Sequence, residues 1–474
     1  MNDKWFSSPV YGEVFIKTAW FLPLFMLIAV SCISCSSSAP VPEHLRELPS
    51  NRTVIMISMS ERHGVTLRRE EVIPLLLSHN LEIAEAKERV HEHRALYRAA
   101  WQHLVPILQP GWSSVHVEGG VSSTHGPVLT EESYAWAGSL LSWVINPGQA
   151  VYDLLLAHQS LRTSQDQERL ITEDVIHQTL QDYNALMLSR HAMLLAQARL
   201  RQAEALTQLE EQRWNQGTGL EIDRLRARAQ ESKAKMDLLD AGIQFYKHSS
   251  DLVVRLHLEP DLLVVPPEND LQIQKSVQIP VHVEQASALA IMNRPDLAII
   301  RDRIQSSQLR RQQLMAALLS PQVQGGAMLA PAPPTGSTAS TLIRESRQSW
   351  NVRWLITPEW EAQFAVAISR HRVVSLDMAH RLDDVRARLN LDGSRASALM
   401  EQITLSRQLE HDADKAVQLA QVQNQTGTML EVDVLMAQSK AAEAHYKTAA
   451  LITQMNDCQD DLLEDMGLLN PENN

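Results

Sequence analysis

The sequence contains little glycine, cysteine or aromatic residue. Its 474 residues include 17 Gly, 3 Cys and 5% aromatic side chains. Three cysteines cannot build a disulfide framework, and two of them, Cys32 and Cys35, stand close to the N-terminus. The scarcity of glycine and aromatic residues argues against an all-β fold or a doubly wound enzyme and favours long helices.

Basic clusters and catalytic motifs are also missing. Asp and Glu (56) outnumber Lys and Arg (43), and no basic stripe is available to neutralise phosphates, which argues against a nucleic-acid partner. There is no HExxH, GxSxG, GxGxxG or P-loop motif, so we expect neither an enzyme nor a cofactor site. His91 and His93 are two apart on a predicted helix and point to different faces, so we expect no metal site there.

The N-terminal segment carries the only long apolar run. Residues 20–30 are apolar and follow Lys17, but they are too few for a bilayer-spanning helix of ~20 residues, so we interpret residues 1–31 as a signal peptide. Ser31 before Cys32 resembles a bacterial lipobox and predicts lipid attachment at Cys32, with Cys35 as the alternative. A plain signal peptide with incidental cysteines explains the segment as well.

The chain repeats its own plan. Residues 149–216 contain neither Gly nor Pro, residues 359–426 contain only Gly393, and the two runs end at Gly217 and Gly427. We infer that the two halves of the chain arose by duplication. Each half begins with a helix (82–105 and 296–319), followed by a segment without a helical pattern (106–147 and 321–358). A very long helix, a glycine turn and a return helix complete each half. The predicted organisation is signal peptide 1–31, tether 32–64, first repeat 65–260, mixed linker 261–292, second repeat 293–469 and tail 470–474.

The long helices carry the apolar spacing of a coiled coil. Ile176, Leu180, Tyr183, Met187 and Leu194 follow one another at steps of three, four or seven residues. A helix of this length would span roughly 100 Å, so it belongs to a coiled coil or a larger assembly. An ordinary helical bundle core is the alternative.

The segments 106–147 and 321–358 have the pattern of strands. Trp350, Val352 and Trp354 alternate with polar residues, as in a membrane β-barrel, although soluble hairpins that cap a bundle explain the pattern equally well. Two hairpins make four strands, fewer than the ~8 that a barrel needs. Because open sheet edges are not tolerated in lipid, membrane strands would require a barrel shared between chains.

Together these features resemble the TolC-like outer membrane efflux proteins, the exit ducts of tripartite pumps and type I secretion systems. Residues 293–297 read NRPDL, similar to the run that opens the second half of these proteins, and residues 427–437 resemble their return-helix signature. The resemblance covers roughly residues 65–469. It implies a mainly α fold with a small β part: a homotrimer with a long α-helical barrel and a shared 12-stranded β-barrel.

The resemblance also implies a function and partners. The trimer would be a passive channel in the outer membrane, lipid-anchored, extending into the periplasm and working with a periplasmic adaptor protein and an inner-membrane pump. The alternative is a periplasmic coiled-coil adaptor or scaffold lipoprotein without channel activity. An adaptor has a single helical hairpin, whereas this chain predicts two.

The glycine turns are the expected functional site. In the family they are periplasmic tips that meet the adaptor, which assigns docking to Gly217, Thr218, Gly219, Leu220, Gly427, Thr428 and Leu430. Acids follow each turn, and the resemblance implies that they line the pore entrance: Glu221, Asp223, Glu431 and Asp433. The spacing predicts Asp433 about two turns up the return helix. The alternative is that these acids only stabilise a helix N-terminus.

The sequence departs from the family near this entrance. Some members have an Arg near the place of Met429, and a second Asp can stand at the place of Met436. We therefore expect a single acidic ring at Asp433 and no ionic lock.

Overall fold

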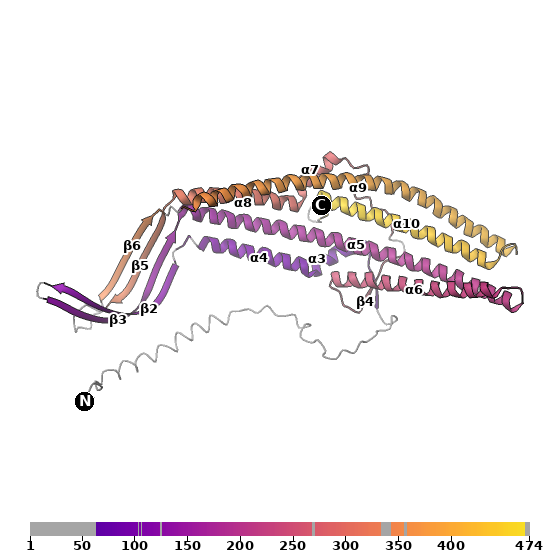
Figure 1. Cartoon of the computed structure of the whole chain (residues 1–474), viewed down its shortest axis with the longest axis horizontal. Helices are drawn as coiled ribbons and strands as arrows, with labels where there is room; N and C mark the ends of the chain where they lie inside the picture. The colour runs from indigo at the N-terminus through magenta and orange to yellow at the C-terminus, as the bar shows by residue number, and fades with distance from the viewer. Residues whose placement is uncertain are drawn as a thin grey trace, which may run out of the picture. The chain divides into compact units, whose positions relative to one another are not determined.

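In the computed structural model, the chain has the same order of strands and helices twice (Figure 1). The structure describes residues 63–102, 104–105, 107–123, 126–267, 271–332, 343–354 and 358–469. The predicted signal peptide 1–31, both candidate lipid-attachment residues Cys32 and Cys35, and the tail 470–474 lie outside these residues.

Eight helices are found in the described part of the chain, four in the first repeat, one in the linker and three in the second repeat. The first repeat has α3 (Arg69–His79), α4 (Leu81–Gln102), α5 (Pro147–Asn215) and α6 (Glu221–Arg255). The linker ends in α7 (Val283–Asn293), and the second repeat has α8 (Pro295–Leu319), α9 (Trp360–Gln425) and α10 (Glu431–Met466). The prediction of a mainly α, duplicated fold is confirmed.

The long helices follow from local sequence. α5 has 69 residues and α9 has 66, which match the two runs without helix breakers. At the start of α5, the Asn146 side chain accepts a hydrogen bond from the Gln149 backbone N–H, and Pro147 occupies the first helical position. Gly393 does not interrupt α9, which continues through it.

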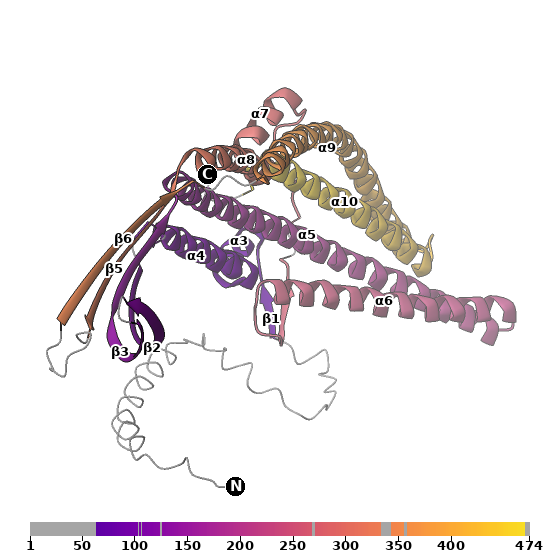
Figure 2. The same ribbon diagram turned by 60° about the vertical axis from the view of Figure 1, so that its left-hand side comes forward.

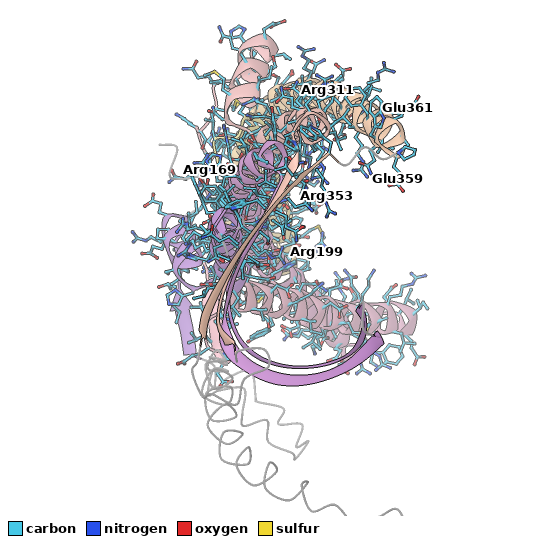
Figure 3. The ribbon with its side chains drawn as sticks, turned by 90° about the vertical axis from the view of Figure 1, so that its left-hand side faces the viewer. Arg169, Arg199, Arg311, Arg353, Glu359 and Glu361 are labelled. Carbon is cyan, nitrogen blue, oxygen red and sulfur yellow. The ribbon has the colours of Figure 1, made fainter. Side chains whose placement is uncertain are left out.

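The two hairpins form one sheet at one end of the helices (Figure 1). Its strands are β2 (Ile107–Ser123), β3 (Gly126–Ile145), β5 (Gln322–Ala332) and β6 (Ile343–Arg353). Their order is β2-β3-β5-β6, and every neighbouring pair is antiparallel. Figure 3, viewed from the strand end, shows that the sheet is strongly curved. Strands β2 and β6 are therefore its two open edges.

A small second sheet lies beside α6. Strand β1 (His63–Thr66) pairs in parallel with β4 (Leu262–Val265), and the Val264 N–H donates to the Ser249 hydroxyl of α6 at 2.8 Å. One core surrounds it and includes the fully buried Leu76, Ile176, Leu186, Leu252 and Val264. A second core packs α7, α9 and α10 through Ala290, Leu389, Ile403, Met455 and Leu462. The described residues all belong to one compact unit.

The predicted coiled-coil seam on α5 is correct over its first part. Ile176, Leu180, Tyr183 and Met187 are buried. Leu194 does not continue this seam within the chain, because its side chain is 49% exposed and the neighbouring Leu195 is buried instead. A straight helix drifts by ~20° for each step of seven residues, so the next residue takes the seam position.

Candidate functional site at the helix tips

The two glycine turns have the same backbone structure. Gly217 joins α5 to α6 with φ 74°, and Gly427 joins α9 to α10 with φ 75°. The N–H of Thr218 donates to the Arg213 carbonyl at 2.9 Å, and the N–H of Thr428 makes the equivalent bond to Gln423 at 3.0 Å. Glycine is required because L residues rarely adopt this positive φ at a helix end.

Both turns lie at the end of the molecule opposite the sheet (Figure 1), and they stand apart from each other in Figure 2. Leu220 and Leu430 follow the turns as the N-cap residues of α6 and α10, and their side chains are 66% and 52% exposed. Leucine cannot accept the hydrogen bond that a capping side chain normally takes. These residues therefore place apolar surface at both tips without stabilising the helix start.

The four predicted entrance acids lie in the first turns of the return helices. Glu221 and Asp223 begin α6, and Glu431 and Asp433 begin α10. The expectation that Asp433 stands two turns up the helix is wrong, because α10 begins only at Glu431. Leu430 is still extended, with φ −80° and ψ 153°.

The acids of the two tips have different surroundings. Glu221 lies 3.5 Å from Arg224, and Asp223 lies 3.6 Å from Arg226. Asp433 is exposed beside the buried Val434, and no residue that the structure describes forms an ion pair with it. The described residues also include no ion pair or hydrogen bond that joins one tip to the other. Within one chain, the structure does not bring Asp223 and Asp433 together.

An aromatic and cationic contact on the first tip was missed by the sequence reasoning. The Arg224 guanidinium carbon lies 4.8 Å from the centre of the Trp214 ring. The equivalent residues of the second repeat are Asn424 and Val434, and the Asn424 side chain instead donates to the Met429 carbonyl at 3.0 Å. Comparing the repeats residue by residue would have revealed this difference. The tips thus share a backbone and differ in chemistry.

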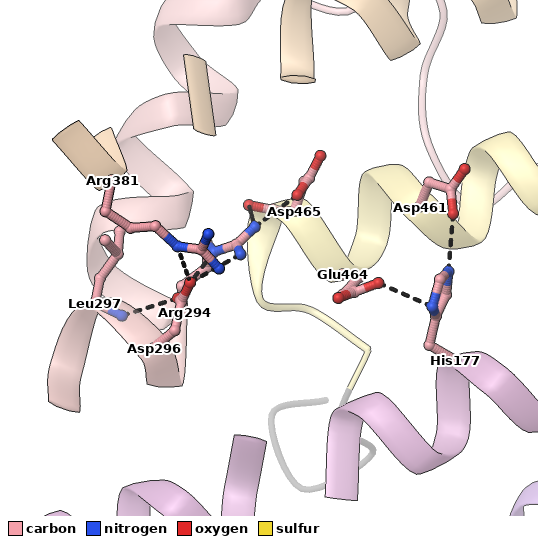
Figure 4. Close-up of polar contacts among 8 residues, drawn as sticks. All are labelled: His177, Arg294, Asp296, Leu297, Arg381, Asp461, Glu464 and Asp465. Carbon is pink, nitrogen blue, oxygen red and sulfur yellow. Dashed lines mark hydrogen bonds and ion pairs between the residues drawn. The ribbon is translucent and has the colours of Figure 1, made fainter. Parts of the chain in front are cut away.

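The NRPDL run is part of a buried ion-pair cluster rather than of the tips (Figure 4). The Arg294 guanidinium donates to Asp465 of α10 at 2.6 Å and to Asp296 at 2.9 and 3.0 Å. Arg381 of α9 also donates to Asp296 at 2.9 Å. Burial opposes ionisation of Asp296, but the two guanidinium groups hold its pKa below the usual value. The run therefore connects the start of α8 to α9 and to the end of α10.

A histidine of α5 joins the same region (Figure 4). His177 lies 2.8 Å from Asp461 and 2.9 Å from Glu464, both on α10. Burial alone would lower the pKa of His177, but its hydrogen bonds to these carboxylates raise it to about 10. Acids near a helix C-terminus oppose the helix dipole, so cations from other helices must compensate them. The acid-rich end of α10, residues 457–465, is the sequence signal for this cluster.

Two kinds of feature are absent from the part of the chain that the structure describes. Within it, no three His, Cys, Asp or Glu side chains converge as a metal site requires. None of the helices described combines the length and apolar character needed to cross a membrane.

Comparisons with known proteins identify the fold. No family model and no curated protein matches the sequence. A membrane protein from Pseudomonas aeruginosa is 16% identical with a TM-score of 0.71, over 84% of this chain and 93% of that one. The Campylobacter jejuni CmeC outer membrane channel is 13% identical with a TM-score of 0.69, over 84% and 85%. The open state of the Neisseria gonorrhoeae MtrE outer membrane channel is 16% identical with a TM-score of 0.65, over 84% and 89%.

The chain therefore has the fold of TolC-like outer membrane channels, and the resemblance seen in its sequence is confirmed at the level of the fold.

Proposed function

We propose that three copies of this chain form an outer membrane channel, the exit duct of a tripartite efflux or type I secretion system. Transport through it is passive. Two proteins with the same fold, from Campylobacter jejuni and Neisseria gonorrhoeae, are outer membrane channels by name. The observation that carries the proposal for this chain is the four-stranded sheet with two open edges.

The open edges support assembly into a closed barrel. Because β2 and β6 run antiparallel in the order β2-β3-β5-β6, β6 of one copy can pair antiparallel with β2 of the next. Three copies then give a 12-stranded barrel without free edges, which a sheet in lipid requires. A single copy would leave the backbone groups at the edges of β2 and β6 unpaired in the membrane.

The helices and the intervening segment supply the rest of the duct. In this proposal the repeats 65–260 and 293–469 each contribute two strands and one pair of long helices, and residues 261–292 belong to a belt around the tube. α5, with 69 residues, reaches roughly 100 Å from the sheet, a length suited to crossing the periplasm.

The tips are the proposed contact with a periplasmic adaptor protein, which connects the channel to an inner-membrane pump. Their exposed leucines, Leu220 and Leu430, offer apolar surface to such a partner. Three copies of Asp433 would form an acidic ring at the entrance, because this carboxylate is exposed while the neighbouring Val434 is buried.

Lipid attachment at Cys32, or at Cys35, is the proposed second anchor in the outer membrane. Mass spectrometry of the mature N-terminus tests it. An unmodified chain that starts beyond Ser36 would contradict it.

The decisive test of the channel combines assembly with conductance. Protein purified from the outer membrane should be a trimer that forms ion-conducting pores in a planar bilayer. The pair Leu108→Cys and Val352→Cys, on the exposed ends of β2 and β6, should form cross-links between chains under oxidation, whereas Leu108→Cys alone should not. A stable monomer without conductance would favour the scaffold alternative and reject the channel.

A further inference from the structure

A groove with three arginines lies along α8, close to the sheet. Its volume is ≈ 880 Å³, and its lining residues come from α5, α8 and α9. Arg303 and Arg310 belong to α8, and Arg370 belongs to α9. Because α8 ends at Leu319 and α9 begins at Trp360, the groove occupies the first turns of helix below the strands.

Helical spacing explains why these side chains share one surface. Arg303, Ser307, Arg310 and Leu314 follow one another at steps of four, three and four residues, so they lie on one face of α8. Val366 and Arg370 are one turn apart on α9. The groove is therefore a built feature of three adjacent helices.

The charge in the groove is not compensated. Among the residues that the structure describes, Arg303 and Arg370 have no hydrogen-bond or ion-pair partner, and Arg310 donates only to the Gln313 side chain at 3.0 Å. No Asp or Glu lines the groove. In a chain with a net charge of −13, this surface concentrates positive charge and should attract anions.

The groove lies on the concave side of the helix layer. α8 contacts both α5 and α9, and Figure 3 shows the three helices along an arc, curved in the same direction as the sheet. Hollows lined by all three helices lie on both faces of α8, and we place the larger one on the concave side, where the two outer helices lean toward each other. The groove on the opposite face of α8, beside Arg311, is smaller, at ≈ 290 Å³.

We propose that this groove binds amphiphilic organic anions inside the duct. A sulfonate, carboxylate or phosphate group would contact the three guanidinium groups, whose planar, forked N–H donors bind pairs of oxyanion oxygens well. The apolar part of the same molecule would lie against Leu156, Leu314 and Val366. The location inside the duct rests on the proposed trimer, in which the three concave faces enclose the lumen.

Two matched probes test the proposal: anilinonaphthalene sulfonate, which is anionic, and phenylnaphthylamine, its neutral analogue. Binding is measured by titration calorimetry to the full protein in phosphatidylcholine nanodiscs, with empty nanodiscs as baseline. The triple variant Arg303→Gln, Arg310→Gln, Arg370→Gln should bind the sulfonate at least about tenfold more weakly, because each guanidinium contact to a charged group is lost. The corresponding triple Lys variant should retain part of the affinity.

Control measurements separate the groove from general surface charge. Arg311→Gln removes one charge of α8 that does not line the groove and should leave sulfonate binding unchanged. Phenylnaphthylamine should bind the wild type and the triple variant equally. Unchanged sulfonate binding in the triple Gln variant would overturn the proposal.

The same samples distinguish this inference from the proposed function. If the protein forms conducting pores but the three arginines do not affect sulfonate binding, the groove proposal is wrong and the channel proposal is still supported. A protein that loses sulfonate binding in the triple variant but never conducts would support the groove and reject the duct. An anionic phospholipid that co-purifies with the wild type and is absent from the triple variant would identify a lipid as the occupant and overturn the proposal.

Discussion

Arg294 and Asp465 form a buried ion pair, with Nη1 lying 2.6 Å from Oδ1, that joins the start of α8 to the last turn of α10. Their side chains are only 5% and 7% exposed. Gly467 follows at the end of α10 with φ 68°, and a Cβ placed there would lie 2.6 Å from the Arg294 backbone nitrogen. The beginning and the end of the second repeat are therefore held together by charge and by close backbone approach.

Loss of Arg294 should destabilise the protein strongly. In Arg294→Met, Asp465 and Asp296 remain buried without this cation, which should lower the free energy of unfolding by about 3–5 kcal/mol. The control Arg386→Met removes an exposed pair with Asp383, 3.9 Å away, and should cost about 1 kcal/mol or less. Thermal unfolding followed by circular dichroism compares them, and equal losses would contradict this reading.

His177 should make stability depend on alkaline pH. Burial works against its charge, yet hydrogen bonds to Asp461 and Glu464 raise the pKa of His177 from 6.5 to about 10. A raised folded-state pKa contributes stability that is full below pH 6.5 and is lost as the pH rises toward 10. His177→Gln should therefore melt below the wild type at pH 6, with a gap that narrows up to pH 10. A constant gap would contradict the assignment.

Glu173 should act in the same direction as His177, but at lower pH. Burial raises the pKa of Glu173 from 4.5 to about 7, while Arg294 opposes this rise. The folded protein therefore holds a proton that the unfolded chain has lost, so stability falls as the pH rises from 4.5 to about 7. Relative to the wild type, Glu173→Gln should gain melting temperature across this window and then level off. If the difference in melting temperature between Glu173→Gln and the wild type did not change with pH, the raised pKa of Glu173 would be contradicted.

A side chain at either tip glycine should destabilise the protein, for backbone reasons alone. A Cβ at Gly217 has no atom within 4 Å, so the cost of Gly217→Ala, about 1 kcal/mol, comes from its positive φ. Gly242→Ala is the matched control, since it has the same open space inside α6 and should stabilise by about 0.5–1 kcal/mol. Urea unfolding should show a lower free energy of unfolding for Gly217→Ala and a higher one for Gly242→Ala than for the wild type.

The same turns provide a functional test. Gly217→Val or Gly427→Val should weaken export in cells without preventing trimer assembly, because the strained turn displaces the surface proposed to meet the adaptor. Export at the wild-type level with either variant would place the docking surface elsewhere.

Asp433 should influence ion selectivity more than Asp223 does. Asp433→Asn removes an exposed carboxylate that pairs with no described residue, so the cation preference of the pore and its block by divalent ions should fall. Asp223→Asn should have a smaller effect, because Arg226 already lies 3.6 Å from that carboxylate. Bilayer recordings measure both. Unchanged selectivity in Asp433→Asn would place the residue away from the entrance.

Several parts of the site could be read from the sequence because they depend on neighbouring residues. The turns at Gly217 and Gly427 were predicted from the breaker-free runs that end there, and both have the expected positive φ. Asp433 was placed too far along its helix because the sequence does not show that Leu430 remains extended. The contact between Arg224 and Trp214 was missed, since it joins two helices across a turn.

The sequence by itself determined the helices, the turns and the two hairpins, because helix length, turn conformation and strand alternation arise from residues close together in the chain. Only the tertiary structure decided that β3 pairs with β5, that His177 meets α10 and that Arg303, Arg310 and Arg370 share a groove. Helical periodicity states which face of a helix a residue occupies. It does not state which distant helix packs beside that face, and the charge of a surface depends on both.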